Sequence, residues 1–258
     1  AVADALSRSG AGWAEPLFWA GLVTLVGPFT IRLASAGAAR QERIGLVAVL
    51  GLMLYLVKIM HSPFGFTFSD ELIHIYNAKG ILQAGALFRE NPILSVTALY
   101  PGLETTTAAL ASLSGLNAFG AGLLLVGAAR LILTLALFLF YEQVGGSARV
   151  AGLATLLYMA NSNFLYWGVQ FSYESLALPL ATLVLFAAAR RESARNKTQR
   201  FGFTMIALLV IGAVVMTHHM SSYFLTAFLL IWALAPLLFR LTTTLIARKI
   251  VPWYTGQM

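Results

Sequence analysis

The sequence contains no cysteine and few charged residues. Without cysteine, neither a disulfide framework nor a thiolate metal site can form. Asp, Glu, Lys and Arg make up only 10% of the 258 residues, against roughly 25% in soluble globular chains. The hydrophobic share of 59% exceeds what one soluble core of this size can enclose, so lipid must solvate much of the surface. The composition therefore predicts an all-α, polytopic membrane protein.

Several functional motifs are also missing. The sequence has no Walker-type phosphate loop, no dinucleotide-binding glycine fingerprint and no zinc-protease motif. The chain therefore lacks the usual means of using ATP or a nucleotide-linked substrate directly. The net charge of +7 does not indicate a nucleic-acid partner, because the basic residues form short clusters between apolar runs, as topology signals do.

Seven apolar stretches are candidate transmembrane helices, for which about 20 residues are needed. They are 16–34, 44–60, 119–140, 148–166, 172–189, 201–217 and 220–239. Asn161, Ser162 and Asn163 interrupt the fourth stretch, which favours a short or re-entrant piece there. As one helix, residues 201–239 would be about twice as long as the hydrocarbon is thick, so we expect a hairpin that turns near Thr217–His219.

Basic and acidic residues separate between alternate connections. If all seven stretches cross the bilayer, one side carries 12 basic and three acidic residues, and the other carries four basic and seven acidic ones. Lys and Arg accumulate in cytoplasmic connections, so the first side is predicted to be cytoplasmic. Residues 1–258 then form a single transmembrane domain, with its acidic and histidine residues gathered on the extracytoplasmic side.

The longest connection, residues 61–118, is expected to be an extracytoplasmic loop with helices of its own, because it is far too long for a plain turn. Ser69 is placed to cap a helix that begins at Asp70. A helical apolar stripe predicts that this helix is amphipathic and lies on the outer membrane surface. The stripe consists of Leu72, Ile75, Leu82 and Ala86. After turns at 91–92 and 100–102, residues 104–114 are expected to be helical again.

The strongest local pattern is the pair Asp70-Glu71, with His74 one helical turn later. Adjacent carboxylates repel each other in a low dielectric, which favours a shared proton or a shared cation. Such a pair can act as general base towards an acceptor hydroxyl or can bind a divalent metal. Asp70 and Glu71 are therefore the candidate catalytic residues, and the candidate Mg²⁺ or Mn²⁺ ligands if a metal takes part. The alternative is that both only favour a helix N-terminus and face water.

Further polar residues on the same side are candidate substrate-binding residues. They are His74, Glu104, Glu174, His218 and His219. A carboxylate as close to an apolar span as Glu174 is costly and is usually paired or functional. Neighbouring helical residues point about 100° apart, so the two adjacent histidines share one metal only in an irregular turn; one of them can bind a phosphate or orient a carboxylate. The alternative for Glu104 is an ordinary acid at a helix N-terminus, and for the others an interfacial position.

Two basic residues complete the candidate substrate-binding set. Arg130 falls near the middle of the 119–140 stretch, where a charge usually faces the protein interior or a polar cavity. It is a candidate to pair with an acid or to bind a phosphate that enters from the bilayer. Lys58 lies near the outer end of the second stretch, where snorkelling to the interface is the favoured interpretation and ligand binding the alternative.

A spanning helix leads into a long outer loop that begins Phe68-Ser69-Asp70-Glu71 and reaches Tyr100-Pro101-Gly102. This arrangement resembles the GT-C class of polytopic membrane glycosyltransferases. Ser172-Tyr173-Glu174 and Thr217-His218-His219 resemble segments of bacterial members. The resemblance covers roughly residues 44–225. An extra span, 16–34, precedes it, and many members are longer, so the chain is expected to be a fragment or a minimal module.

The resemblance implies an inverting transferase that takes a sugar from a polyprenyl-phosphate carrier. In the class an acidic residue of the first outer loop is typically catalytic, which matches Asp70 or Glu71 here. The implied acceptor is a hydroxyl of a glycan, a lipid or a protein. The implied location is a bacterial cytoplasmic (inner) membrane, with the site facing the extracytoplasmic side.

Two other functional classes fit the sequence. A transporter or flippase of an amphiphilic lipid-linked substrate would use the same charges to line a path, and it predicts polar residues continuing towards the cytoplasmic side. A non-catalytic membrane subunit would use them to bind a partner. Only Arg130 lies at mid-depth, which ranks transport behind sugar transfer.

Overall fold

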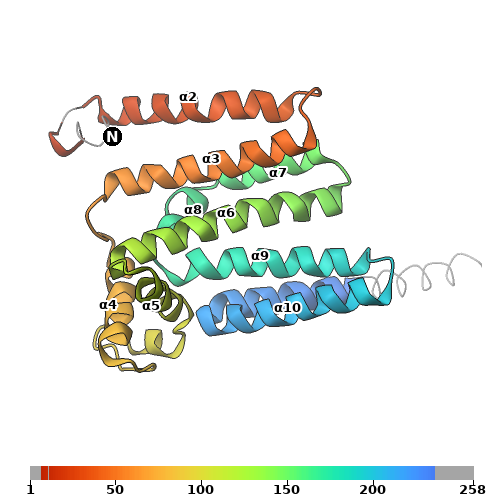
Figure 1. The fold of residues 1–258 in the computed structure, drawn as a ribbon. Helices are drawn as coiled ribbons and strands as arrows, with labels where there is room; N and C mark the ends of the chain where they lie inside the picture. Colours follow the sequence, from red (N-terminus) through yellow and green to blue (C-terminus); the bar gives the residue numbers. More distant parts are fainter. Residues whose placement is uncertain (1–6, 11, 236–258) are drawn as a thin grey trace, which may run out of the picture.

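The computed structural model describes residues 7–10 and 12–235, and these residues contain helices and no strands. Figure 1 shows the long helices lying side by side, with α4 across one end of them. The helices are α2 (Ala14–Ala34), α3 (Arg40–His61), α4 (Ser69–Ala84), η1 (Ser95–Leu99), α5 (Gly102–Ser114), α6 (Ala118–Gly145), α7 (Ala148–Met159), α8 (Ser162–Leu165), η2 (Trp167–Val169), α9 (Tyr173–Glu192) and α10 (Lys197–Thr217). A further apolar helix runs from His219 to Ala235.

Five of the described helices are long and apolar enough to cross a membrane, rather than seven. They are α2, α3, α6, α9 and α10. The predicted fourth stretch, 148–166, is interrupted as its polar residues indicated, because α7 ends at Met159 after 12 residues. The predicted turn near Thr217–His219 is present, since α10 ends at Thr217 and a new helix starts at His219. The end of the last stretch at 239, together with Arg240, Arg248 and Lys249, lies outside the described residues.

The two ends of the helix bundle differ in charge. One end, here called the basic end, contains the connections 35–39, 146–147 and 193–196 and the arginines that flank them. Arg40 pairs there with Glu142 at 2.7 Å, and Arg32 pairs with Glu42. The opposite end, here called the acidic end, contains residues 62–117 with α4 and α5 (Figure 1). The structure therefore places the expected loop 61–118 at one end of the bundle.

Helix α6 forms the centre of the bundle, because it packs against α3, α7 and α9. The core around it contains Leu50 of α3, Phe138 of α6 and Met159 of α7, each almost fully buried. Small residues allow the helices to approach closely, as is usual between membrane helices. A Cβ atom at Gly51 would lie only 2.5 Å from Cγ2 of Thr134, so α3 and α6 touch at a position that requires glycine.

Helix α4 differs from the amphipathic helix that the apolar stripe predicted. Its buried face consists of Glu71, His74, Ile75 and Ala78, whereas Leu72 is 50% exposed and Ala86 lies beyond the helix end. The cap was also predicted wrongly, because Ser69 is the first helical residue and Phe68 is the N-cap. The side chain of Glu71 satisfies the Phe68 N–H instead. Helix α4 therefore buries a partly polar face at the acidic end.

Candidate functional site

Glu71 joins three segments of the acidic end. Its Oε1 lies 2.7 Å from Nζ of Lys58 on α3 and accepts a 3.1 Å hydrogen bond from the backbone N–H of Phe171. Its Oε2 accepts hydrogen bonds from the backbone N–H groups of Thr67 and Phe68. The carboxylate is completely buried, and its oxygens are occupied by the protein itself. This geometry gives Glu71 the position of a structural anchor beside the candidate base.

Lys58 does not snorkel, contrary to the interpretation that the sequence favoured. The side chain is 5% exposed and ends on Glu71, 5.3 Å from the ring centre of Phe66 and 5.6 Å from that of Phe68. A buried ammonium needs a counter-charge in a low dielectric, and Glu71 supplies it. The direction of Lys58 towards α4 was not predictable from its position on α3 alone.

Asp70, His74 and Glu104 form a chain of polar groups between α4 and α5. The Nδ1 atom of His74 lies 2.7 Å from Oε1 of Glu104, and both side chains are buried. On the other side of the ring, Nε2 of His74 lies 3.8 Å from Oδ1 of Asp70. Asp70 is the open end of this chain, since its side chain is 42% exposed. A carboxylate that holds Nδ1 fixes the orientation of an imidazole, as in acid–base sites generally.

Tyr173 and Glu174 bring the start of α9 to the same place. The Tyr173 ring lies 4.0 Å from the His74 ring, edge to face, and its hydroxyl donates a 2.6 Å hydrogen bond to the carbonyl of Thr97. Glu174 is close enough to Asp70 and His74 to interact electrostatically with both. Tyr173 was not among the residues predicted to form the site, although it stands beside Glu174 in the sequence. An aromatic residue next to an acidic one does not by itself indicate a functional site in the sequence.

The turn after α10 adds His218 and His219. The ring of His218 stacks on Tyr173 with centres 5.5 Å apart, and its Nδ1 lies 2.8 Å from the Ser221 hydroxyl. The pKa of His218 is lowered, first because burial disfavours the imidazolium and then because His219 and His74 repel it, while Asp70 opposes the shift. His219 lies 4.9 Å from the Tyr100 ring, and its Nδ1 has no hydrogen-bond partner within the described part of the chain.

Arg130 lies apart from this group, against the interrupted segment that follows α7. Its guanidinium lies 3.3 Å from the ring centre of Phe164, and Nη1 donates a 3.3 Å hydrogen bond to the carbonyl of Gly168. The side chain is completely buried, and Nε and Nη2 have no hydrogen-bond partner among residues 7–10 and 12–235. Arg130 faces the protein interior, as predicted for a charge at mid-depth, and it stabilises irregular backbone there.

The structure thus brings most of the predicted site residues together. Asp70, His74, Glu104, Glu174 and the 218–219 pair converge at the acidic end, with Lys58 and Glu71 directly behind them. Among the described residues, no group of three or more His, Cys, Asp or Glu side chains is arranged to hold a metal ion. The side chains that converge are carboxylates and imidazoles, which can exchange protons and form hydrogen bonds.

Comparison of the chain with protein-family models, with curated proteins and with solved structures finds no match. The site has to be interpreted from its own chemistry.

Proposed function

We propose that the chain is the membrane module of an inverting glycosyltransferase, which moves a sugar from a polyprenyl phosphate to an acceptor hydroxyl on the extracytoplasmic side. The observation that carries this proposal is the half-exposed Asp70 at the end of the buried His74–Glu104 pair. A carboxylate open to solvent and backed by an oriented imidazole is suited to accept a proton from a bound hydroxyl. The acidic end then faces away from the cytoplasm, in agreement with the basic residues at the other end.

In the proposed reaction Asp70 removes the proton of the acceptor hydroxyl. The acceptor oxygen forms a bond to the anomeric carbon of the sugar while the bond from that carbon to the phosphate oxygen breaks. The polyprenyl phosphate leaves with the electron pair, and the configuration at the anomeric carbon inverts. His74 lies 3.8 Å from Asp70, where it can interact with it electrostatically, and is itself held by Glu104. Glu174, beside Asp70, is placed to bind sugar hydroxyls.

The leaving phosphate needs a hydrogen-bond donor or a positive charge near it. Of the basic residues predicted for this role, Lys58 is neutralised by Glu71, and Arg130 is enclosed against Phe164. His219 is only partly buried, so we assign the phosphate contact to the exposed edge of its ring, while its unpartnered Nδ1 is itself enclosed. Lys58 and Arg130 then have structural roles and do not contact the phosphate.

The transporter alternative has less support in the geometry. Buried charged side chains of the described residues gather at the acidic end and at Arg130. Near the basic end the buried arginine is Arg43, which is occupied by the backbone carbonyls of Leu33 and Ser35. A translocation path would need polar groups that continue through the bundle.

The test is a turnover assay in lipid nanodiscs with a panel of synthetic polyprenyl-phosphate sugars, with release of polyprenyl phosphate as the readout. Asp70→Asn is compared with Glu15→Gln, which neutralises a carboxylate on the distant helix α2. We expect release by the wild type and by Glu15→Gln, and a fall of at least about 10²-fold for Asp70→Asn, the range of general-base catalysis. Wild-type turnover by Asp70→Asn would exclude the assigned base. If neither the wild type nor either variant turns over any carrier, the transferase proposal is wrong.

A further inference from the structure

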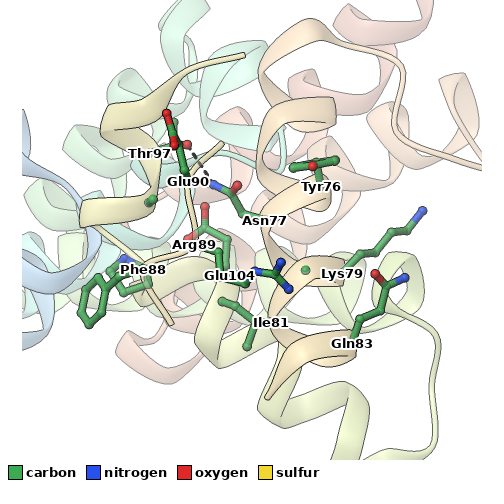
Figure 2. Close-up of a pocket in the computed structure, with 13 residues that line it drawn as sticks. Tyr76, Asn77, Lys79, Ile81, Gln83, Phe88, Arg89, Glu90, Thr97 and Glu104 are labelled. Carbon is green, nitrogen blue, oxygen red and sulfur yellow. Dashed lines mark hydrogen bonds between the residues drawn. The ribbon is translucent and has the colours of Figure 1, made fainter. Parts of the chain in front are cut away.

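A cavity of about 280 Å³ opens beside the C-terminal half of α4. Figure 2 shows its wall, which is formed by α4, by residues 88–90, by residues 97–98 of η1 and by the start of α5. Ligand pockets occupy about 300–1,000 Å³, so this cavity suits a ligand at the small end of that range. The residues that matter for its chemistry are Tyr76, Asn77, Gln83, Phe88, Arg89 and Glu104.

Glu104 connects this cavity with the candidate active site. Its Oε1 bonds to His74, whereas its Oε2 is buried and has no hydrogen-bond partner in the described part of the chain. Glu104 as a whole is 0% exposed, and it lines the cavity. A buried carboxylate oxygen without a donor is costly. Oε2 has almost no accessible surface as it stands, so a hydroxyl or amine donor of a ligand reaches it when the Glu104 side chain turns towards the cavity.

The aromatic residues at the cavity mouth indicate what kind of ligand fits. Tyr76 is 51% exposed and Phe88 is 57% exposed, although each could bury a large apolar area. Phe88 has a φ of +59°, which is uncommon for a residue other than glycine. Such strained residues cluster at binding sites, where the surrounding structure holds them in place. Two open rings beside amide and carboxylate groups match a pyranose, which has apolar C–H faces and a polar hydroxyl edge.

The polar wall of the cavity is held rigidly in place. The amide of Asn77 donates to the hydroxyl of Thr97 at 2.9 Å and accepts from the Asn91 amide at 2.7 Å. Asn91 in turn accepts from the backbone N–H groups of Ile93 and Leu94. This network fixes the loop 91–97 against α4 without any ligand. A preformed pocket avoids the ordering cost that would otherwise weaken binding.

We infer that this cavity binds a saccharide unit of the acceptor, one unit removed from the hydroxyl that reacts. The His74 ring stands between Glu104 and Asp70, so a sugar bonded to Oε2 of Glu104 cannot present its own hydroxyl to Asp70. We therefore assign the reacting hydroxyl to the neighbouring unit of an oligosaccharide. The acceptor is therefore a glycan of at least two units. This assignment rests on the proposed transferase function, but saccharide binding at the cavity can be measured without turnover.

The binding test is saturation-transfer difference NMR on the protein in nanodiscs, which detects the millimolar affinities expected of single sugars. The probes are the methyl glycosides of mannose, glucose and galactose, with cyclohexanol as a ring of similar size and one hydroxyl. Tyr76→Ala removes one aromatic wall, and Glu104→Gln removes the orphan acceptor. Leu72→Ala is the matched control, because Leu72 is equally exposed one turn earlier on α4 and does not line the cavity.

We expect saturation transfer to at least one glycoside and none to cyclohexanol. Tyr76→Ala should weaken that binding about tenfold, and Leu72→Ala should not change it. Since Tyr76 is exposed, its variant is expected to fold even if Glu104→Gln does not. Absence of glycoside binding, or equal binding by Tyr76→Ala and the wild type, would overturn the inference.

A turnover assay separates this inference from the proposed function. With an active carrier, wild-type protein should use disaccharide acceptors at a lower KM than monosaccharide acceptors, and Tyr76→Ala should abolish that difference with little change in kcat. Turnover without cavity binding refutes the saccharide site alone. If glycosides bind in the cavity but no carrier is turned over, the saccharide site is supported and the transferase function is refuted.

Discussion

The ammonium of Lys58 and the carboxylate of Glu71 lie 2.7 Å apart, and both side chains are almost completely buried. Removing one partner of such a pair leaves an uncompensated charge in a low dielectric, which costs about 3–5 kcal/mol. We expect Lys58→Met to lower the melting temperature in detergent strongly. The double variant Lys58→Met/Glu71→Gln should recover part of the loss, because no charge is then left unpaired. A double variant no more stable than Lys58→Met would show that the pair is not coupled.

The contact between α5 and α10 predicts a second effect on stability. A Cβ atom at Gly102 would lie 2.5 Å from Oγ1 of Thr217 and 2.9 Å from the Met216 carbonyl oxygen. Gly102→Ala should therefore destabilise the protein by about 1–3 kcal/mol, as overpacking does. Gly212→Ala is the control, because open space surrounds that position on α10. Equal melting temperatures for the two variants would mean that α5 and α10 do not meet as described.

The interrupted segment after α7 depends on Arg130. Replacing Arg130 by Ala removes its contact with the Phe164 ring and its hydrogen bond to the Gly168 carbonyl. We expect faster backbone hydrogen exchange in residues 160–172, measured by mass spectrometry. Arg149→Ala, at an exposed position near the start of α7, should leave exchange there unchanged. Slow exchange in both variants would show that Arg130 does not support this segment.

His218 predicts a dependence of stability on pH. Its pKa is lowered in the folded protein by burial and by His219 and His74, so the unfolded chain binds the proton more tightly. The neutral side chain contributes fully above about pH 6.5, the ordinary histidine value, and the contribution is lost as the pH falls through the lowered folded pKa. The melting-temperature advantage of wild type over His218→Gln should therefore be larger at about pH 8 than at about pH 5. An advantage that grows on acidification would reverse the sign of the predicted shift.

The His74–Glu104 hydrogen bond predicts an effect on the proposed chemistry. Glu104→Gln removes the carboxylate that orients the His74 ring, so it should lower kcat about 10-fold or more and shift the pH–rate profile, as expected when an acid–base group changes its environment. A purely structural role would lower stability but leave the pH profile of the remaining activity in place. His61→Gln, an exposed residue at the end of α3, serves as the control.

The sequence predicts the helical class and the grouping of polar side chains at one end better than the details of either. The charge and polarity pattern alone predicts that Asp70, His74, Glu104 and Glu174 lie at one end of the bundle. It does so because membrane topology follows from the distribution of apolar runs and arginines. The predicted stripe on α4 is not confirmed, because the buried face of the helix is partly polar and is supported by partners that are distant in sequence. Glu71 accepts a hydrogen bond from the backbone N–H of Phe171, 100 residues away, and a hydropathy pattern does not reveal such a contact.

The predicted number of seven spans is not confirmed among the described residues, for a similar reason. An apolar stretch indicates what lipid tolerates, but not where a helix stops. Asn161 starts a new four-residue helix by accepting the Asn163 N–H, so α7 ends before it reaches the length of a span. The snorkelling interpretation of Lys58 failed because a lysine near a helix end can turn inward when a carboxylate is present. Contacts between segments that are distant in sequence can be identified only from the three-dimensional structure.

The short length of α7 has a consequence for the surrounding bilayer. Twelve residues of α-helix rise only about 18 Å, against a hydrocarbon thickness of about 30 Å. The polar residues that follow, and the exposed rings of Tyr166 and Trp167, favour headgroup depth, so lipids beside them are drawn inward. We expect the membrane to be locally thin on this flank of the protein, and lipids with shorter acyl chains to relieve the mismatch. Acyl-chain length thereby becomes a determinant of which membranes suit this protein.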